Sequence, residues 1–154
     1  YEQHVLGYNY RMSDIHASLA ISQLSRLKKI IITRNTIAKN YQKILSKFPL
    51  KLPQIPKDNL CSFHLYIIQI KKDYKKSSRE KLFNYLRKNK IYTNLHYMPV
   101  HLHPYYYRNS NTKIRNAEEY SKYALSIPIY EKLRFKDQLV IKKIIQKGLR
   151  FENK

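Results

Sequence analysis

The 154-residue sequence predicts an α/β (α+β) domain that is preceded by one long helix. Two observations lead to this prediction. A helical apolar pattern runs from about residue 14 to residue 46, and short β-branched or aromatic runs then alternate with segments that begin like helices. No internal repeat is visible, so we expect one small domain of roughly 100 residues after the long helix.

The long helix is predicted to begin at Ser13-Asp14, which follows a polar loop and can cap a helix. Its length would be about 50 Å, so it is either one helix that links two domains or two helices with a bend at residues 33–35. Three prolines between Pro49 and Pro56 predict its end. One apolar stripe follows its face: Ile15, Leu19, Leu24, Leu27, Ile31, Ala38, Tyr41, Leu45 and Phe48.

A strand and a helix are predicted next. Residues 61–71 (CSFHLYIIQIK) are rich in β-branched and aromatic side chains, which favours a strand and makes Cys61 and His64 candidates for the core. Ser77 and Glu80 have the spacing of a capping box, so a helix should run from there to about Lys88.

The last third of the chain continues this alternation. Residues 91–97 predict a strand and residues 98–111 a loop, and Asn116 and Glu119 predict a second capping box for a helix that reaches residues 123–125. Residues 126–130 predict a short strand. A final helix from about Lys136 should end at Gly148, because glycine is common just past a helix end.

The composition narrows the class of protein. The chain has 31 basic and 10 acidic residues, a net charge of +21, which favours polyanions such as RNA. The basic residues are scattered, however, and abundant Lys, Ile, Asn and Tyr with few Gly also fit an AT-rich genome. Cys61 is the only cysteine, no apolar run approaches the roughly 20 residues of a membrane helix, and no signal peptide is visible. We therefore expect a cytoplasmic chain that does not engage a membrane, and, since it begins with Tyr1, a fragment or processed chain.

Residues 92–107 (YTNLHYMPVHLHPYYY) are the densest group of functional side chains. They suit a metal site, a stacking surface for bases, or a pocket for a polar organic substrate. His101 and His103, with His96 nearby, lack an evident set of further ligands, so we expect no metal. No RNA- or DNA-binding motif, nucleophile motif or phosphate-binding glycine loop occurs, so no nucleic-acid partner is expected.

Four stretches in the same order resemble the DegT-type sugar aminotransferases: LGYNYRMSDIHASLAISQLSRL, S-F-HLY-I-I, NLHYMPVHLHPYY and AEEYSKYALSIPIY. The resemblance covers nearly the whole chain, from Tyr1 to about Ile145. Within the family, the YEQ start and the HYMPVHLHPYY form are most similar to the aminotransferases of the pseudaminic acid pathway, which serves surface glycan biosynthesis. Those enzymes aminate C4 of a UDP-linked 4-keto-6-deoxy-N-acetylhexosamine, with pyridoxal 5′-phosphate (PLP) as cofactor and glutamate as amino donor.

The resemblance implies the C-terminal part of a fold type I aminotransferase. Residues 1–35 would be the end of the large cofactor domain and the start of the connecting helix, and residues 36–154 the small domain. The family's cofactor-binding lysine lies in an upstream segment that this sequence does not contain. We therefore nominate no catalytic residue here, and we expect a homodimeric full-length enzyme whose isolated C-terminal part is inactive.

The resemblance also implies which residues bind. Asn9 matches an asparagine that reaches the cofactor phosphate and the substrate of the neighbouring subunit, while Arg11 would pair with a phosphate or fix its own loop. Residues 94–97 (Asn94, Leu95, His96 and Tyr97) match a segment lining the nucleotide-sugar site; Leu95 also suits core packing. In the following loop His101, with Tyr105 and Tyr106, would shape that pocket or pack the loop on the domain.

One departure from the family bears on the backbone. Asn89-Lys90 stands where the family usually has glycine before the strand, and asparagine can take the left-handed conformation at lower cost than most residues. Two readings outside the enzyme class stay open: a basic module that binds RNA or another polyanion, and an inactive truncated gene product.

Overall fold

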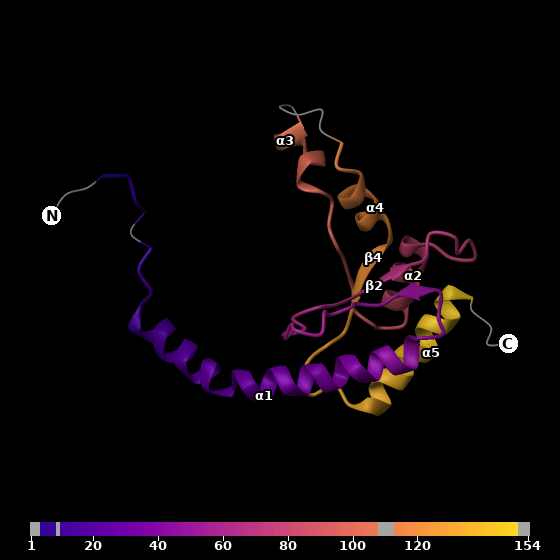
Figure 1. The fold of residues 1–154 in the computed structure, drawn as a ribbon, viewed down its shortest axis with the longest axis horizontal. Helices are drawn as coiled ribbons and strands as arrows, with labels where there is room; N and C mark the ends of the chain where they lie inside the picture. Colours follow the sequence, from indigo (N-terminus) through magenta and orange to yellow (C-terminus); the bar gives the residue numbers. More distant parts are fainter. Residues whose placement is uncertain (1–3, 9, 108–112, 151–154) are drawn as a thin grey trace.

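A computed structural model describes residues 4–8, 10–107 and 113–150 of the chain (Figure 1). The structure confirms the predicted class: a mixed α/β domain that is preceded by one long helix. In chain order the elements are α1 (Asp14–Leu45), β1 (Leu50–Lys51), β2 (Tyr66–Ile70), α2 (Arg79–Lys88), β3 (Asn94–Leu95), the 3₁₀ helix η1 (Val100–Leu102), α3 (Pro104–Tyr107), α4 (Arg115–Tyr123), β4 (Ala124–Ile127) and α5 (Phe135–Leu149).

The described strands form one antiparallel sheet in the order β1-β2-β4-β3. Successive side chains of a strand point to opposite faces, so β2 sends Tyr66, Ile68 and Ile70 to one face and Ile67 and Gln69 to the other. The first set is fully buried and the second is half-buried. One face of the sheet therefore carries the core.

Helices α1, α2 and α5 cover that core face, and α4 lies against the other. The rings of Tyr41 on α1 and Tyr66 on β2 meet at its centre with 5.1 Å between their centroids. Gln138 of α5, which is fully buried, donates from Nε2 to the Ile37 carbonyl (2.9 Å) and accepts from Asn40 Nδ2 (3.2 Å). These polar contacts fix α5 against α1, because a misplaced helix would leave a buried amide without partners.

Helix α1 is a single helix, so the alternative of two helices with a bend at residues 33–35 is wrong. Its predicted start is confirmed, since the Ser13 hydroxyl accepts a hydrogen bond from His16 N (3.5 Å). Only its second half packs: Ile37, Ala38, Tyr41 and Leu45 are buried, whereas the first half exposes its apolar stripe, including Ile15 at 81% and Leu24 at 67%. Figure 1 shows this first half extending well beyond the sheet.

The N-cap residues predicted for two helices, α2 and α4, were wrong. Helix α2 is capped by Ser78, whose hydroxyl accepts from Lys81 N (3.2 Å), while Ser77 donates from Oγ to the Gly148 carbonyl (3.0 Å). Helix α4 begins after Ile114, and not at Asn116. For α2 the two adjacent serines offered equivalent local patterns, and the distant contact of Ser77 with Gly148 leaves Ser78 as the cap. For α4 the residue at the cap position is Ile114, whose side chain makes no capping hydrogen bond.

The glycine and asparagine predictions also need correction. Gly148 lies inside α5, which ends at Leu149 and is capped by Arg150 in the left-handed conformation (φ 52°). A Cβ on Gly148 would lie 2.8 Å from Leu82 Cδ1 and 2.9 Å from Tyr85 Cδ1, so the residue allows α2 and α5 to approach closely. Before β3, the left-handed residue is Lys90 (φ 60°) and not Asn89 (φ −92°).

The strand predicted over residues 61–71 is confined to β2, because α1 holds residues 61–64 by side-chain hydrogen bonds. Arg34 donates from one nitrogen, Nη1, to the carbonyls of Phe63 (3.0 Å) and His64 (3.1 Å), and Asn35 Nδ2 donates to the Cys61 carbonyl (2.9 Å). Phe63 is left-handed (φ 45°), which breaks the extended backbone. Cys61 packs against the core as predicted, but His64 is exposed, so the prediction of a core histidine was wrong.

Candidate functional site

The segment that the sequence singles out begins on the edge strand β3. Asn94 and Leu95 pair with Ser126 and Leu125 of β4, and the Ser126 hydroxyl reaches the Asn94 carbonyl (3.5 Å). The Asn94 side chain is exposed, whereas Leu95 is half-buried and packs against the core. Asn94 can therefore meet a ligand while Leu95 anchors the strand beneath it.

His96 and Tyr97 point in different directions. His96 is 4% exposed and Tyr97 is 70% exposed, and their rings meet edge to face with centroids 4.7 Å apart. Burial lowers the pKa of the His96 imidazole, so the ring is neutral at pH 7. Among the described residues His96 Nε2 has no hydrogen-bond partner, and the nearby Thr93 hydroxyl has none either. Tyr97 is thus the member of this pair that a ligand can reach directly.

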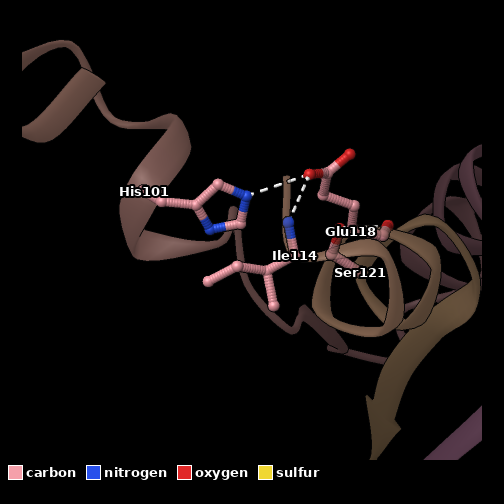
Figure 2. A network of polar contacts seen from close by, with 4 residues as sticks. All are labelled: His101, Ile114, Glu118 and Ser121. Carbon is pink, nitrogen blue, oxygen red and sulfur yellow. Dashed lines mark hydrogen bonds and ion pairs between the residues drawn. The ribbon is translucent and has the colours of Figure 1, made fainter. Parts of the chain in front are cut away.

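His101 is turned away from solvent toward α4 (Figure 2). Its Nε2 lies 3.0 Å from Glu118 Oε1, and the same oxygen accepts the Ile114 backbone N–H at 3.2 Å. An ionised carboxylate only accepts, so Nε2 must carry the hydrogen. The hydrogen bond from His101, followed by that from Ile114 N, holds the pKa of the Glu118 carboxyl below its usual value. The pair fixes η1 to the first turn of α4.

We use "the arm" for residues 98–107, which contain η1 and α3 and project from the sheet in Figure 1. Tyr105 and Tyr106 are exposed, and their rings meet edge to face at 5.0 Å. His103 Nε2 lies 3.3 Å from the Met98 carbonyl, which closes the turn into α3. In the described part of the chain no three His, Cys, Asp or Glu side chains lie close enough to hold a metal ion.

The N-terminal candidates lie elsewhere. Asn9 is outside the described residues. Arg11 is exposed on the extended segment before α1, at the free end of that helix, and Figure 1 shows this end far from the arm and the sheet. Within one chain, Arg11 is therefore not brought together with residues 94–97. An exposed guanidinium can bind a phosphate, but one such group is not a complete cofactor site.

Residues 1–146 match the sequence profile of the DegT/DnrJ/EryC1/StrS aminotransferase family. The chain belongs to this family. A curated relative, the spore coat polysaccharide biosynthesis protein SpsC of Bacillus subtilis, is 34% identical over 135 residues, which are 84% of this chain and 35% of SpsC.

Solved structures agree on the fold. PseC of Helicobacter pylori, an aminotransferase of pseudaminic acid biosynthesis, matches with a TM-score of 0.86 at 23% identity, over 97% of this chain and 40% of PseC. The sugar aminotransferase Spr1654 of Streptococcus pneumoniae, solved in a PLP form, matches with a TM-score of 0.78 at 24% identity, over 91% of this chain and 36% of its own. The chain thus spans about two-fifths of these relatives, and at such identities the structures establish the fold alone.

Sequence reasoning missed the partner of His101. Glu118 was passed over because it lies 17 residues away and its neighbour Glu119 offered the expected capping spacing. In the structure Glu119 instead pairs with Lys72. The only feature of the sequence that could have pointed to Glu118 is its position in the first turn of a helix, where acidic residues are favoured. A carboxylate there can accept a hydrogen bond from an imidazole that lies nearby.

Among the described helices, none has the length and apolar character to cross a membrane.

Proposed function

We propose that this chain is the C-terminal part of a PLP-dependent aminotransferase that aminates C4 of a UDP-linked 4-keto-6-deoxy-N-acetylhexosamine, with glutamate as donor, in the pseudaminic acid branch of surface glycan biosynthesis. The observation that carries the proposal is the family match over residues 1–146. The choice of branch is supported by the HYMPVHLHPYY residues, which resemble the aminotransferases of the pseudaminic acid pathway. The enzyme would work in the cytoplasm, where nucleotide sugars are made.

In this proposal residues 1–35 complete a large cofactor domain and residues 36–154 form the small domain. The burial pattern of α1 supports that division, because its packing on the sheet begins only at about Arg34 and Ile37. The separation of Arg11 from the arm supports a homodimer. If Arg11 and the arm contribute to one site, they must come from different subunits, or a further domain must connect them within one subunit.

The described residues suggest a division of tasks at the substrate. The exposed Asn94 amide and the Tyr97 phenol would bind sugar hydroxyls or the acetamido group, since each can donate and accept. Leu95 and the neutral His96 would hold that segment from below. His101, which is bound to Glu118, would act by placing the arm.

The cofactor would be held mainly by residues outside this chain. Bound PLP would supply the electron sink for transfer of the amino group. Arg11 would contribute a cationic donor and Asn9 a neutral one to phosphate groups. Two such donors can form part of a cofactor-phosphate site but not all of it. By itself, therefore, the chain should not transaminate.

The test is a coupled assay of 2-oxoglutarate formation from glutamate and the UDP-linked 4-keto sugar, with the full-length enzyme that the proposal requires. Asn94→Ala and Tyr97→Phe should raise KM by about two- to tenfold, the effect of losing one neutral hydrogen bond. Lys143→Ala, an exposed change on α5, serves as the matched control. No turnover with this sugar would refute the substrate assignment, and unchanged KM values would refute the roles of the two residues.

A further inference from the structure

A hollow that the proposed function does not use lies between the sheet and the loop that follows β1. Its volume is about 770 Å³, within the range of small-molecule sites. Its floor is the face of β2 opposite the core, with Ile67 and Gln69, and is extended by Leu65 just before the strand. Tyr120 of α4 lines one side. Because the strand order is β1-β2-β4-β3, this hollow and Asn94 lie toward opposite edges of the sheet.

The strand register places two lysines together at the rim of this hollow. Lys51 is paired with Gln69, and Lys71 follows Gln69 by two residues, so it points to the same face. The Lys71 N–H donates to the Pro49 carbonyl (3.0 Å), which continues the ladder past β2. Lys51 and Lys71 are therefore diagonal neighbours across the strands, with Cα atoms roughly 7–8 Å apart.

No acidic side chain offsets these two charges within the hollow. None of the residues that line it is Asp or Glu. Glu119 of α4 lines an adjoining recess, which Lys51 and Gln69 also line, and its carboxylate is paired with Lys72. Two like charges side by side repel each other, and a bound anion between them would remove that repulsion. Gln69 is opposite Lys51 and on the same face as Lys71, so its amide adds a neutral donor next to both lysines.

The opposite wall is held in place without a ligand. Gln42 of α1 donates from Nε2 to the Pro53 carbonyl, and Asn35 and Arg34 donate to the carbonyls of Cys61 and Phe63. The loop from Pro53 to Phe63 is thus tied to α1 near both of its ends. A wall fixed in this way costs little further ordering when a ligand binds.

The rest of the hollow is apolar. Leu65 and Ile67 on the floor and Ile55 on the wall present aliphatic surface, and Ile55 and Leu65 are exposed. A ligand that fills this space should therefore have a flat apolar or aromatic body next to its charged end. An inorganic anion would use the lysines and leave the apolar surface in water.

We propose that this hollow is a binding site for a small organic phosphate, with the phosphate between Lys51 and Lys71 and an aromatic body on Leu65 and Ile67. A phosphate fits better than a single carboxylate because it can carry two negative charges to match two ammonium groups. The site would be separate from the sugar-nucleotide segment at residues 94–97, which belongs to the other edge of the sheet.

The experiment is a titration of the ¹⁵N-labelled 154-residue chain with phenyl phosphate, followed by amide chemical shifts, with inorganic phosphate as a second arm at equal ionic strength. Phenyl phosphate should give saturable shifts at Lys51, Ile67 and Gln69 and bind about fivefold more tightly than inorganic phosphate. The double variant Lys51→Gln/Lys71→Gln should weaken binding by about tenfold or more.

The matched control is Lys143→Gln/Lys147→Gln, which removes the same charge from exposed positions on α5 and should change the affinity less than twofold. Far-UV circular dichroism of both double variants checks that they are folded. Shifts that spread over the basic surface without saturation, equal losses in both double variants, or shifts confined to residues 94–97 would each overturn the proposal.

Discussion

Tyr41 and Tyr66 can be compared to test how much a buried hydroxyl with or without a hydrogen-bond partner contributes to the free energy of unfolding. Both are fully buried and their rings are in contact, yet their hydroxyls differ. Tyr41 OH donates to the Pro128 carbonyl at 2.9 Å, whereas Tyr66 OH has no partner among the described residues. Replacing each tyrosine with phenylalanine removes one oxygen from the same environment, so the comparison isolates the hydrogen bond.

Tyr41→Phe should lower the free energy of unfolding by about 1–2 kcal/mol, since it removes a hydrogen bond and leaves a carbonyl without its partner. Tyr66→Phe should raise it by about 1 kcal/mol, because an unpaired buried hydroxyl costs roughly 1–3 kcal/mol and only a small void replaces it. Urea unfolding followed by circular dichroism at 222 nm measures both. If Tyr66→Phe destabilises the chain as much as Tyr41→Phe, the Tyr66 hydroxyl has a partner and the reasoning is wrong.

Three further predictions follow from single contacts. Gly148→Ala should lower the free energy of unfolding by about 1 kcal/mol, because crowding of Leu82 and Tyr85 outweighs the better helix propensity of alanine; a stability gain would contradict this close approach of α2 and α5. The Glu118 carboxylate should contribute stability that is present above pH 5 and lost as the pH falls through its lowered pKa, and Glu118→Gln should remove that contribution. The urea midpoints of wild type and variant should therefore converge toward pH 3, and a constant gap would argue against the His101–Glu118 pair. Burial raises the pKa of the Tyr41 and Tyr66 phenols, so the stability linked to their protonated form is complete below pH ~10 and is lost as the pH rises above it. An absorbance titration at 295 nm should show two phenols that ionise only on unfolding. Their ionisation in the folded chain would contradict their burial.

Local patterns predicted the elements better than their ends. The Ser13 cap and the apolar stripe were enough to predict α1, because both depend on residues within one or two turns. Periodicity could not show that only the second half of that stripe is buried, since it reports which side of a helix is apolar and not what covers it. The choice of Ser78 over Ser77 depended on a contact with Gly148, 71 residues away.

For the candidate site, the sequence predicted a segment and the structure separated its side chains. Residues 92–107 were all candidates for a pocket, and only the fold shows that Tyr97 faces solvent while His96 is buried. The His101–Glu118 contact joins two elements with no shared periodicity, so no local rule could reveal it. The hollow between Lys51 and Lys71 depends on strand register, which short strands with few alternating residues do not specify.

We propose that this chain completes an aminotransferase whose cofactor-binding lysine lies outside it. The most direct measurement is reduction of the full-length enzyme, loaded with PLP, by sodium borohydride, followed by peptide mass spectrometry to locate the pyridoxyl group. We predict one modified lysine, upstream of Tyr1, and none among residues 1–154, with the isolated chain unlabelled under the same conditions. A stoichiometric pyridoxyl-lysine within residues 1–154 would contradict the account.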